Sequence, residues 1–324
     1  MILVGDIGGT NTRLAIVDFV KGKFHFRAEK IFSSREEPSL ESALRKFLSE
    51  PFHPIKRACF GVAGPVSHGR CEATNLPWII DSQEIAKQFN IPRVGLLNDL
   101  EINASGIAVL ETKDFEVLNQ GIHDAQGNRA VISAGTGLGQ AGLFWDGREY
   151  RAFASEGGHA DFAPRNHIEM GLLDYLLKRY ARVSVERVIS GQGLLNIYQY
   201  LRDAGHAEEP TWLVDEMRHK APPEVITENA LEEKSSLCVM ALDLFVALYG
   251  AEAGNLALKV MATGGIYLGG GIAPNIIAKL REPLFMNAFT AKGRMKPLLQ
   301  AMPVRVIMNL KTALLGAARH AMGL

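Results

Sequence analysis

The chain has 324 residues, a length that favours two domains, and its 47% hydrophobic and 22% charged content is typical of a soluble globular enzyme rather than a disordered chain. Its 35 lysine and arginine side chains balance 35 aspartate and glutamate side chains. The zero net charge gives no field that would draw the chain onto nucleic acid or an anionic membrane surface.

The first hundred residues predict a sheet with flanking helices. Short apolar runs separated by turn residues are typical of strands, and apolar residues at helical spacing predict helices. Pro38 with Ser39 marks one helix start, and Asp81 is the expected N-cap of the next helix. The expected strands are 2–5, 13–18, 24–32, 55–64 and 94–97, and the expected helices are 40–48 and 81–89.

A strand, a glycine-rich turn and a second strand recur at 130–145, which repeats the arrangement of residues 2–18. The repeat predicts two related α/β halves. Residues 204–226 contain three prolines and are expected to form an irregular insertion. The other expected elements are helices at 168–181, 184–203 and 227–260, a strand, glycine turn and helix start within 263–274, a strand at 304–308 and a helix at 312–322.

Cysteine usage and the N-terminal segment indicate an intracellular protein. Cys59, Cys71 and Cys238 are far apart and form no CxxC pair, which predicts buried, reduced thiols. The opening MILVGDIGG has no basic region followed by a long apolar one, so we expect no signal peptide. No run of about 20 apolar residues is apparent, so we expect no transmembrane helix.

Three glycine-rich turns each follow an apolar strand, at 5–10, 135–139 and 269–271. Glycine lets backbone N–H groups approach an anion closely. GxxxxGK[ST] is absent, and the GxG at 135–137 precedes a strand rather than a helix, so neither a P-loop nor a Rossmann site fits. Hairpin turns that bind phosphate remain, with Thr10 and Thr136 as hydroxyl donors and Asp6 facing Mg²⁺ through water. The alternative is that each turn is only a tight hairpin.

Five polar residues form a second set. Asn98 and Asp99 end an apolar strand, where α/β proteins keep their chemistry, although Asp99 could instead cap the helix expected at 100–110. Glu156 and His159 flank two glycines, and Glu186 lies near an expected helix start. Singly, each has an ordinary structural explanation, and a metal site at the histidine is disfavoured because no second ligand pair is near. As a set, they suit a pocket that binds several sugar hydroxyls.

Eight motifs occur in order along the chain: GDIGGTNTR (5–13), GVAGP (61–65), TNLPW (74–78), LLND (96–99), SAGTGLG (133–139), EGGHADFAP (156–164), ERVISGQGL (186–194) and LGGGIAP (268–274). Together they resemble the bacterial glucokinases of the hexokinase superfamily, over nearly the whole chain. The similarity is to the zinc-free branch, because HADFAPRNH has no cysteine where the ROK sugar kinases carry a cysteine-rich zinc motif.

The resemblance implies an actin-like α/β fold, with two ribonuclease-H-like domains around a central cleft. The small domain takes residues 1–109 and 303–324, and the large domain takes 110–302. This organisation agrees with the internal repeat.

The resemblance also assigns the site. Gly5, Asp6, Ile7, Gly8, Gly9 and Thr10 match the first phosphate loop, Gly135, Thr136, Gly137 and Gly139 match the second, and Gly269, Gly270 and Gly271 border the adenosine. Asn98, Asp99, Glu156, His159 and Glu186 match the glucose-binding positions, and the backbone near Gly64 lines the same pocket. No direct protein cage for a metal is implied, because Mg²⁺ arrives with ATP near Asp6.

The implied activity is ATP-dependent phosphorylation of D-glucose to glucose 6-phosphate, the entry to glycolysis, with ATP and Mg²⁺ as cofactors and Asp99 as the general base. We expect a cytoplasmic homodimer without nucleic-acid or membrane partners. A kinase for another hexose or an amino sugar, or a polyphosphate-using glucokinase, is the alternative enzyme. A sugar-sensing regulator with this fold would carry an added helix-turn-helix. We expect none here, because the first predicted strand begins at residue 2. A filament protein of actin type would not need Asp99 with the Glu–His–Glu set.

Overall fold

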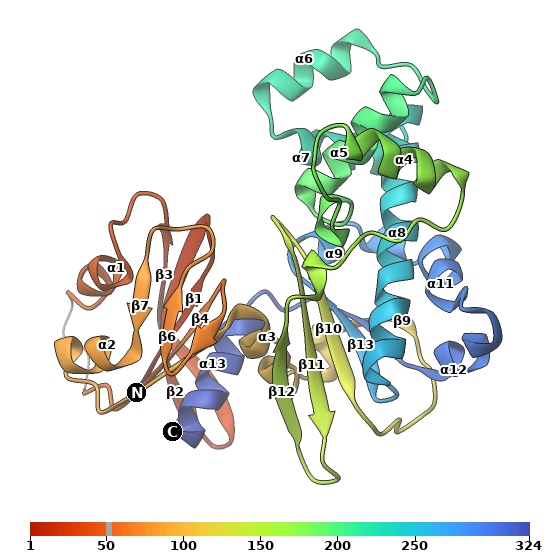
Figure 1. Cartoon of the computed structure of the whole chain (residues 1–324). Helices are drawn as coiled ribbons and strands as arrows, with labels where there is room; N and C mark the ends of the chain where they lie inside the picture. The colour runs from red at the N-terminus through yellow and green to blue at the C-terminus, as the bar shows by residue number, and fades with distance from the viewer. Residues whose placement is uncertain (50–53) are drawn as a thin grey trace. The chain divides into compact units, whose positions relative to one another are not determined.

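The structure is a computed structural model that describes residues 1–49 and 54–324, and these residues fall into two compact units (Figure 1). Unit 1 consists of Met1–Asp114, Ala141–Ala154 and Asn309–Leu324. Unit 2 consists of Phe115–Gln140 and Ser155–Met308.

A five-stranded sheet in the order β3-β2-β1-β4-β8 forms the centre of unit 1. Its strands are β1 (Ile2–Ile7), β2 (Asn11–Val20), β3 (Lys23–Ser33), β4 (Arg57–Val62) and β8 (Arg93–Asn98). β1, β2 and β3 pair in antiparallel fashion, whereas β1, β4 and β8 run parallel. The chain between β4 and β8 forms a small sheet of three strands, β5 (Val66–Ser67), β6 (Arg70–Glu72) and β7 (Ile79–Asp81).

Helices cover both faces of this sheet because its strands alternate apolar side chains toward each face. Helices α1 (Leu40–Phe47) and α2 (Ser82–Phe89) share one core with Leu3, Leu14 and Phe60. Helices α3 (Asp99–Ile107) and α13 (Thr312–Gly323) share the other core with Ile2, Val4 and Ala15. The two predicted helix starts are confirmed: Asp81 is the N-cap of α2 as expected, and Ser39 is the N-cap of α1, since both side chains accept backbone N–H bonds there.

The second sheet has the order β12-β11-β10-β13-β14-β9. Its strands are β9 (Phe115–Asn119), β10 (Arg129–Ala134), β11 (Leu138–Trp145), β12 (Tyr150–Ser155), β13 (Gly265–Gly269) and β14 (Val304–Ile307). The neighbour order of its first five strands repeats that of the first sheet, with β9 added at one edge. The internal repeat predicted from the glycine turns is therefore confirmed.

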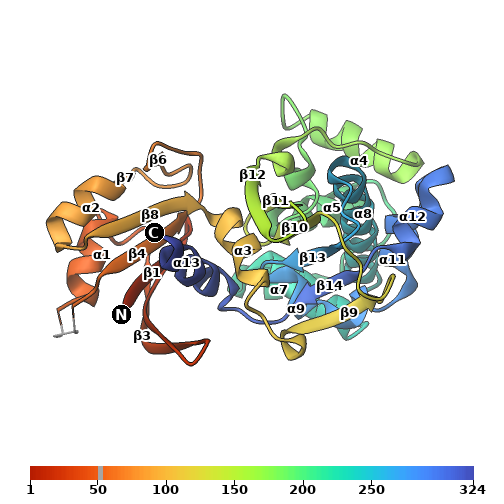
Figure 2. The same cartoon turned by 90° about the horizontal axis from the view of Figure 1, so that it is seen from below.

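Helix α8 (Ser236–Val260) lies along the second sheet, and α5 (Gly191–Asp203), α7 (Pro222–Leu231) and α11 (Pro283–Thr290) pack around it (Figures 1 and 2). The hydroxyl of Tyr249 on α8 donates a 3.1 Å hydrogen bond to the carbonyl of Ile132 in β10. The remaining helices are α4 (His167–Leu177), α6 (Thr211–His219), α9 (Ile272–Asn275), α10 (Ile277–Leu280) and α12 (Lys296–Ala301), with 3₁₀ turns at Thr112–Asp114, Gly157–His159, Val185–Arg187 and Gly293–Met295.

Three predicted helical boundaries are wrong. Residues 204–226 are not irregular, because α6 and the start of α7 lie there, with two prolines in the first turn of α7 where no N–H bond is lost. The helix expected at 227–260 is two helices, since Glu233 adopts a left-handed conformation (φ 55°) and Ser235 caps a new start. The helix expected at 184–203 begins only at Gly191, after a 3₁₀ turn.

Helix α8 is long and apolar enough to cross a membrane, whereas the sequence pattern predicted no such helix. However, 72% of the most apolar 18-residue stretch of this helix is buried within the protein. The hydrophobicity of α8 therefore reflects its place in the core, as in the central helix of a soluble protein. All three cysteines are buried as predicted, and burial raises the pKa of the Cys59 thiol to about 12.

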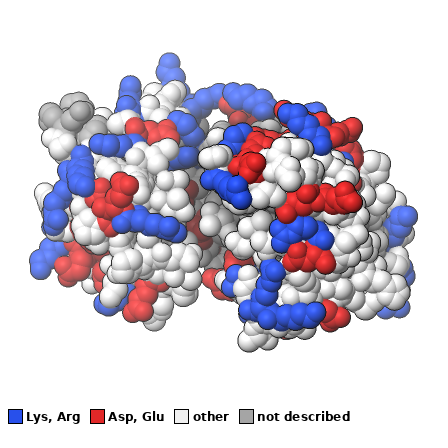
Figure 3. All heavy atoms as spheres, turned by 90° about the horizontal axis from the view of Figure 1, so that it is seen from above, with Lys and Arg blue, Asp and Glu red and all other residues white. Residues whose placement is uncertain are grey.

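The surface mixes charges of both signs. On the face drawn in Figure 3, lysine and arginine side chains alternate with aspartate and glutamate side chains over short distances. Ion pairs also form between side chains of the described surface, as in Arg27 with Asp18 and Lys220 with Glu228. This face therefore carries no extended field of one sign.

Helices α3 and α13 approach each other at two glycines. A Cβ atom on Gly316 would lie 1.7 Å from the carbonyl oxygen of Ile102, and one on Gly106 would lie 2.2 Å from that of Thr312. Both contacts are with backbone, which cannot rotate away as a side chain can. The two helix backbones therefore touch at a distance that only glycine allows.

We predict that Gly316→Ala lowers the free energy of unfolding by about 1–3 kcal/mol or more, as overpacking does, although alanine favours a helix by about 1 kcal/mol over glycine. Gly323→Ala in the same helix is the matched control, because a Cβ there meets nothing within 4 Å. Chemical denaturation of both variants checks this, and equal stability of the two would contradict the packing argument.

Candidate active site

The parallel strands of the first sheet end in register. Ile7 of β1 is aligned with Val62 of β4, which is aligned with Asn98 of β8. The segments that follow these strands, residues 8–10, 63–64 and 99, therefore leave the sheet at the same edge. Chemistry in α/β proteins concentrates at such carboxyl edges.

The first glycine turn is closed by hydrogen bonds. The N–H of Gly8 donates to the carbonyl of Asn11 at 3.0 Å, and the hydroxyl of Ser34 donates to the carbonyl of Gly8 at 2.8 Å. Gly5 and Ile7, also assigned to this loop, lie within β1, and the Ile7 side chain belongs to the core. The turn itself thus comprises Gly8, Gly9 and Thr10, and Thr10 is exposed.

Asn98 caps α3 and is 6% exposed. Its side-chain oxygen accepts the N–H of Leu100 at 2.9 Å, and Glu101 accepts the N–H of Asn98 at 3.1 Å, which completes a capping box. Its amide donates to the carbonyl of Gly64 at 3.1 Å. Asn98 therefore ties the end of β4 to the start of α3.

Asp99 is the first residue of α3, so the alternative that it is the N-cap is wrong, because Asn98 occupies that position. Its carboxylate accepts the N–H of Leu100 at 3.0 Å. A helix N-terminus stabilises a negative charge. Asp99 is thus an ionisable group, neither buried nor fully exposed, held at the same edge as the glycine turn.

The environment of Asp6 suits a nearby cation. Burial raises the pKa of Asp6, and the charge of Arg13, its partner across the β1–β2 pair, opposes the rise. A positive ion would favour the ionised carboxylate there. A carboxylate oxygen is also a donor that Mg²⁺ prefers, so this residue fits a Mg²⁺ that accompanies phosphate.

The second and third glycine turns also lie side by side. Ser133 of β10 is aligned with Gly269 of β13, so residues 135–139 and 270–271 follow neighbouring strand ends. Gly270 has φ +78°, and a Cβ on it would lie 2.2 Å from the carbonyl oxygen of Ala134. The carbonyl of Gly135 accepts the N–H of Gly191 at 2.9 Å, which joins the second turn to the start of α5.

Glu186 is bound to this second turn rather than to a helix start. Its carboxylate accepts the N–H of Leu138 at 2.9 Å. A Cβ on Gly137 would lie 2.5 Å from the same carboxylate, so glycine is needed for the contact. One end of Glu186 is thereby fixed, and its remaining acceptor capacity is available to a ligand.

Glu156 and His159 lie on one tight turn. The Nε2 atom of His159 is 3.8 Å from a carboxylate oxygen of Glu156, and both side chains are exposed, at 53% and 62% respectively. A Cβ on Gly158 would lie 1.9 Å from the carbonyl oxygen of Leu138. The turn therefore rests on the same residue that Glu186 binds, and unit 2 brings all three residues around Leu138.

Sequence reasoning missed two supporting residues, Gln140 and Glu252. They are joined by a 2.9 Å hydrogen bond behind the turn that carries Glu156 and His159. Nothing in the local sequence marks them, because they belong to β11 and α8 and meet only in the fold.

The geometry allows two kinds of recognition. Backbone turns next to strand ends supply N–H donors for phosphate oxygens. Carboxylate, amide and imidazole groups supply acceptors and donors for hydroxyls. Among residues 1–49 and 54–324, no group of three or more His, Cys, Asp or Glu side chains is arranged to hold a metal ion.

Comparison with known proteins gives a consistent result. The sequence model of the family described as Glucokinase matches residues 3–323. The glucokinase of Nostoc sp. strain PCC 7120 is 43% identical over 98% of this chain and 98% of the relative. That of Synechocystis sp. strain PCC 6803 is 40% identical over 98% and 96%.

Solved structures agree. The crystal structure of a glucokinase from an Antarctic psychrotroph matches with a TM-score of 0.85 at 31% identity, covering 100% of this chain and 99% of that one. A ROK family glucokinase from Streptomyces griseus, in complex with glucose and AMPPNP, matches with a TM-score of 0.71 at 19% identity over 100% and 99%, which shows the fold alone. The fold is the actin-like ATPase fold predicted from the motifs.

We predict that the purified, untagged protein contains no stoichiometric zinc. A structural zinc site requires four ligands. Among the described residues, the one ion-pair partner of His159 within 4 Å is Glu156. Elemental analysis of the protein checks this. Zinc bound one-to-one and resistant to chelation would contradict the prediction.

Proposed function

The chain belongs to the glucokinase family and phosphorylates glucose, and on that premise we propose that Asp99 is its general base. Asp99 accepts the proton of the 6-hydroxyl as that oxygen attacks the γ-phosphorus of ATP. The supporting observation is the aligned row of Ile7, Val62 and Asn98, which sets Asp99 at the same edge as the first glycine turn. General base catalysis by a positioned group contributes roughly 10²–10⁴-fold.

The glycine turns have separate tasks. The turns at Gly8 to Thr10 and at Gly135 to Gly139 stabilise charge on the phosphoryl oxygens through backbone amides other than those of Gly8, Gly135 and Leu138, which donate within the protein, and Gly269 to Gly271 border the adenosine. The places of these turns at the ends of β1, β10 and β13 support this division, since phosphoryl transfer depends mainly on positioning and electrostatic stabilisation. Mg²⁺, held through water near Asp6, would neutralise phosphate charge when ATP is bound.

The sugar hydroxyls are bound by the polar set Asn98, Glu156, His159 and Glu186. Their support is the anchoring already described, which leaves each with acceptor or donor capacity toward a ligand. A pocket built to pair with hydroxyls rejects analogues that leave its own groups unpaired.

Several finer assignments complete the proposal. We expect a homodimer in the cytoplasm, acting at the entry to glycolysis, with ATP as donor. Relatives carrying the same family name over nearly the whole chain support glucose rather than an amino sugar. A polyphosphate donor remains the alternative that a donor panel decides.

We predict that Asp99→Asn lowers kcat about 100-fold or more while glucose still binds, because asparagine keeps the size of the side chain and loses its basicity. Steady-state kinetics with glucose and ATP check this. Asp124→Asn, at a side chain that is 88% exposed, is the control and should leave kcat unchanged. Near-full kcat in Asp99→Asn would remove the residue from the chemistry.

We predict that glucose is preferred over fructose, galactose and N-acetylglucosamine, because loss of a hydrogen bond to a charged group costs about 1.5–3 kcal/mol. Comparison of kcat/KM across these sugars measures the preference. Equal values for glucose and N-acetylglucosamine would favour an amino-sugar kinase.

A further inference from the structure

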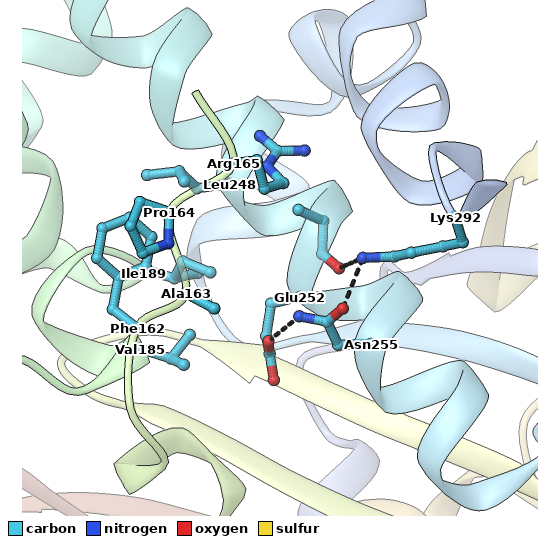
Figure 4. Close-up of a pocket in the computed structure, with 11 residues that line it drawn as sticks. Phe162, Ala163, Pro164, Arg165, Val185, Ile189, Leu248, Glu252, Asn255 and Lys292 are labelled. Carbon is cyan, nitrogen blue, oxygen red and sulfur yellow. Dashed lines mark hydrogen bonds between the residues drawn. The ribbon is translucent and has the colours of Figure 1, made fainter. Parts of the chain in front are cut away.

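A buried chain of hydrogen bonds runs through unit 2 behind the turn of Glu156 and His159. Gln140 of β11 donates its side-chain amide to Glu252 of α8 at 2.9 Å. Asn255 donates to the other carboxylate oxygen at 2.9 Å, and Lys292 donates to the side-chain oxygen of Asn255 at 2.6 Å and to the carbonyl of Ala251 at 2.9 Å (Figure 4). Gln140 is 1% exposed and Glu252 is 5% exposed.

The charges of Lys292 and Glu252 fix the direction of every bond in this chain. The ammonium of Lys292 only donates, so Asn255 must turn its oxygen toward it and its NH₂ toward Glu252. The carboxylate of Glu252 only accepts, so Gln140 must turn its NH₂ toward Glu252. The oxygen of the Gln140 side chain therefore has one orientation.

That oxygen faces the turn of Glu156 and His159. A Cβ on Gly157 would lie 2.1 Å from Oε1 of Gln140, so the carboxamide packs directly on the backbone of Gly157. Gly157 lies between Glu156 and His159 on the 3₁₀ turn, which is closed by the N–H of His159 donating to the carbonyl of Glu156 at 2.9 Å. A change in the orientation of Gln140 would act on the position of this turn.

Packing alone does not hold the network in place. A cavity of about 190 Å³ adjoins it, lined by Glu252, Asn255 and Lys292 on one side and by apolar residues on the other, among them Phe162, Val185 and Ile189 (Figure 4). A buried carboxylate also costs desolvation free energy that an apolar pair of similar volume would avoid. Hydrogen bonds therefore determine where these side chains point.

We propose that Gln140 and Glu252 are positioning residues for glucose binding, which set the turn of Glu156 and His159 without touching the sugar. This inference rests on the proposed sugar-binding role of Glu156 and His159. It goes beyond that role because it attributes part of the affinity for glucose to the order of donors and acceptors in the hydrogen-bond chain that extends from Gln140 to Lys292.

The test is the variant Glu252→Gln. If the oxygen of the new amide at position 252 accepts from Gln140, its NH₂ group faces the NH₂ group of Asn255, and two donors then oppose each other. The substitution therefore breaks the order of donors and acceptors while it keeps the shape of the side chain. We expect the KM for glucose to rise about 10-fold, with kcat and the KM for ATP changed less than about 3-fold, because the lost interaction affects binding rather than chemistry.

The double variant Gln140→Glu with Glu252→Gln is the rescue. It keeps the same atoms and total charge but reverses one bond, since the new amide at 252 donates to the carboxylate at 140 and accepts from Asn255. The KM for glucose should return to within about 3-fold of the wild-type value, because the chain is again satisfied throughout. If the double variant recovers its unfolding midpoint without recovering KM, the network is only structural.

Two further variants separate the possible failures. Glu169→Gln makes the same chemical change at a buried carboxylate that binds Arg165 beside the same cavity, and it should leave the KM for glucose unchanged.

Glu156→Gln tests the turn itself: if it leaves the KM for glucose unchanged, the proposed sugar-binding role of the turn fails. If Glu156→Gln raises KM and Glu252→Gln does not, only the positioning role fails. Should Glu252→Gln not fold, Asn255→Ser breaks the same chain one bond further away, and an unchanged KM in that variant overturns the proposal.

Discussion

The backbone contact between α3 and α13 determines where the proposed base lies. Gly106 and Gly316 let the two helices touch, and Gly61 allows α3 to approach β4, since a Cβ there would lie 2.0 Å from the Ile102 side chain. These contacts set the position of α3, which begins directly after β8. The capping box of Asn98 then fixes the first turn, and Asp99 lies on it.

Unit 2 uses a different backbone element for the same purpose. The backbone N–H of Leu138 donates to Glu186, and the carbonyl of the same residue lies against Gly158. One strand residue thus positions all three proposed sugar contacts of unit 2 together with the second glycine turn. Gln140, two residues further along β11, adds the link to Glu252. In both units, glycine permits a backbone contact and a polar side chain then locks it.

The sequence predicted the parts of this arrangement that have local signals. Apolar runs predicted the five strands of the first sheet and β10, β11, β13 and β14 of the second, and Ser39 and Asp81 marked two helix starts. The edge strands β9 and β12 were missed, because their side chains are half-buried or exposed and form no continuous apolar run. The glycine turns were found because each directly follows a strand. The helices within 204–226 were missed because prolines were taken as breakers, although proline is well tolerated in a first helical turn. The contacts of Leu138 with Glu186 and of Gln140 with Glu252 join residues 48 and 112 positions apart, so only the tertiary structure could reveal them.

Helix α13 has a consequence for how the chain is made. One core of unit 1 contains Ile2, Val4 and Ala15 from the first strands together with Ala313, Leu314 and Ala317 from this helix. All of unit 2 lies between these segments in the chain. During synthesis, which proceeds at roughly 5–20 residues per second, this face of the first sheet therefore lacks α13 until unit 2 has been made, and only α3 is available to cover it. Until then the helix that carries Asp99 also lacks its close backbone contact with α13.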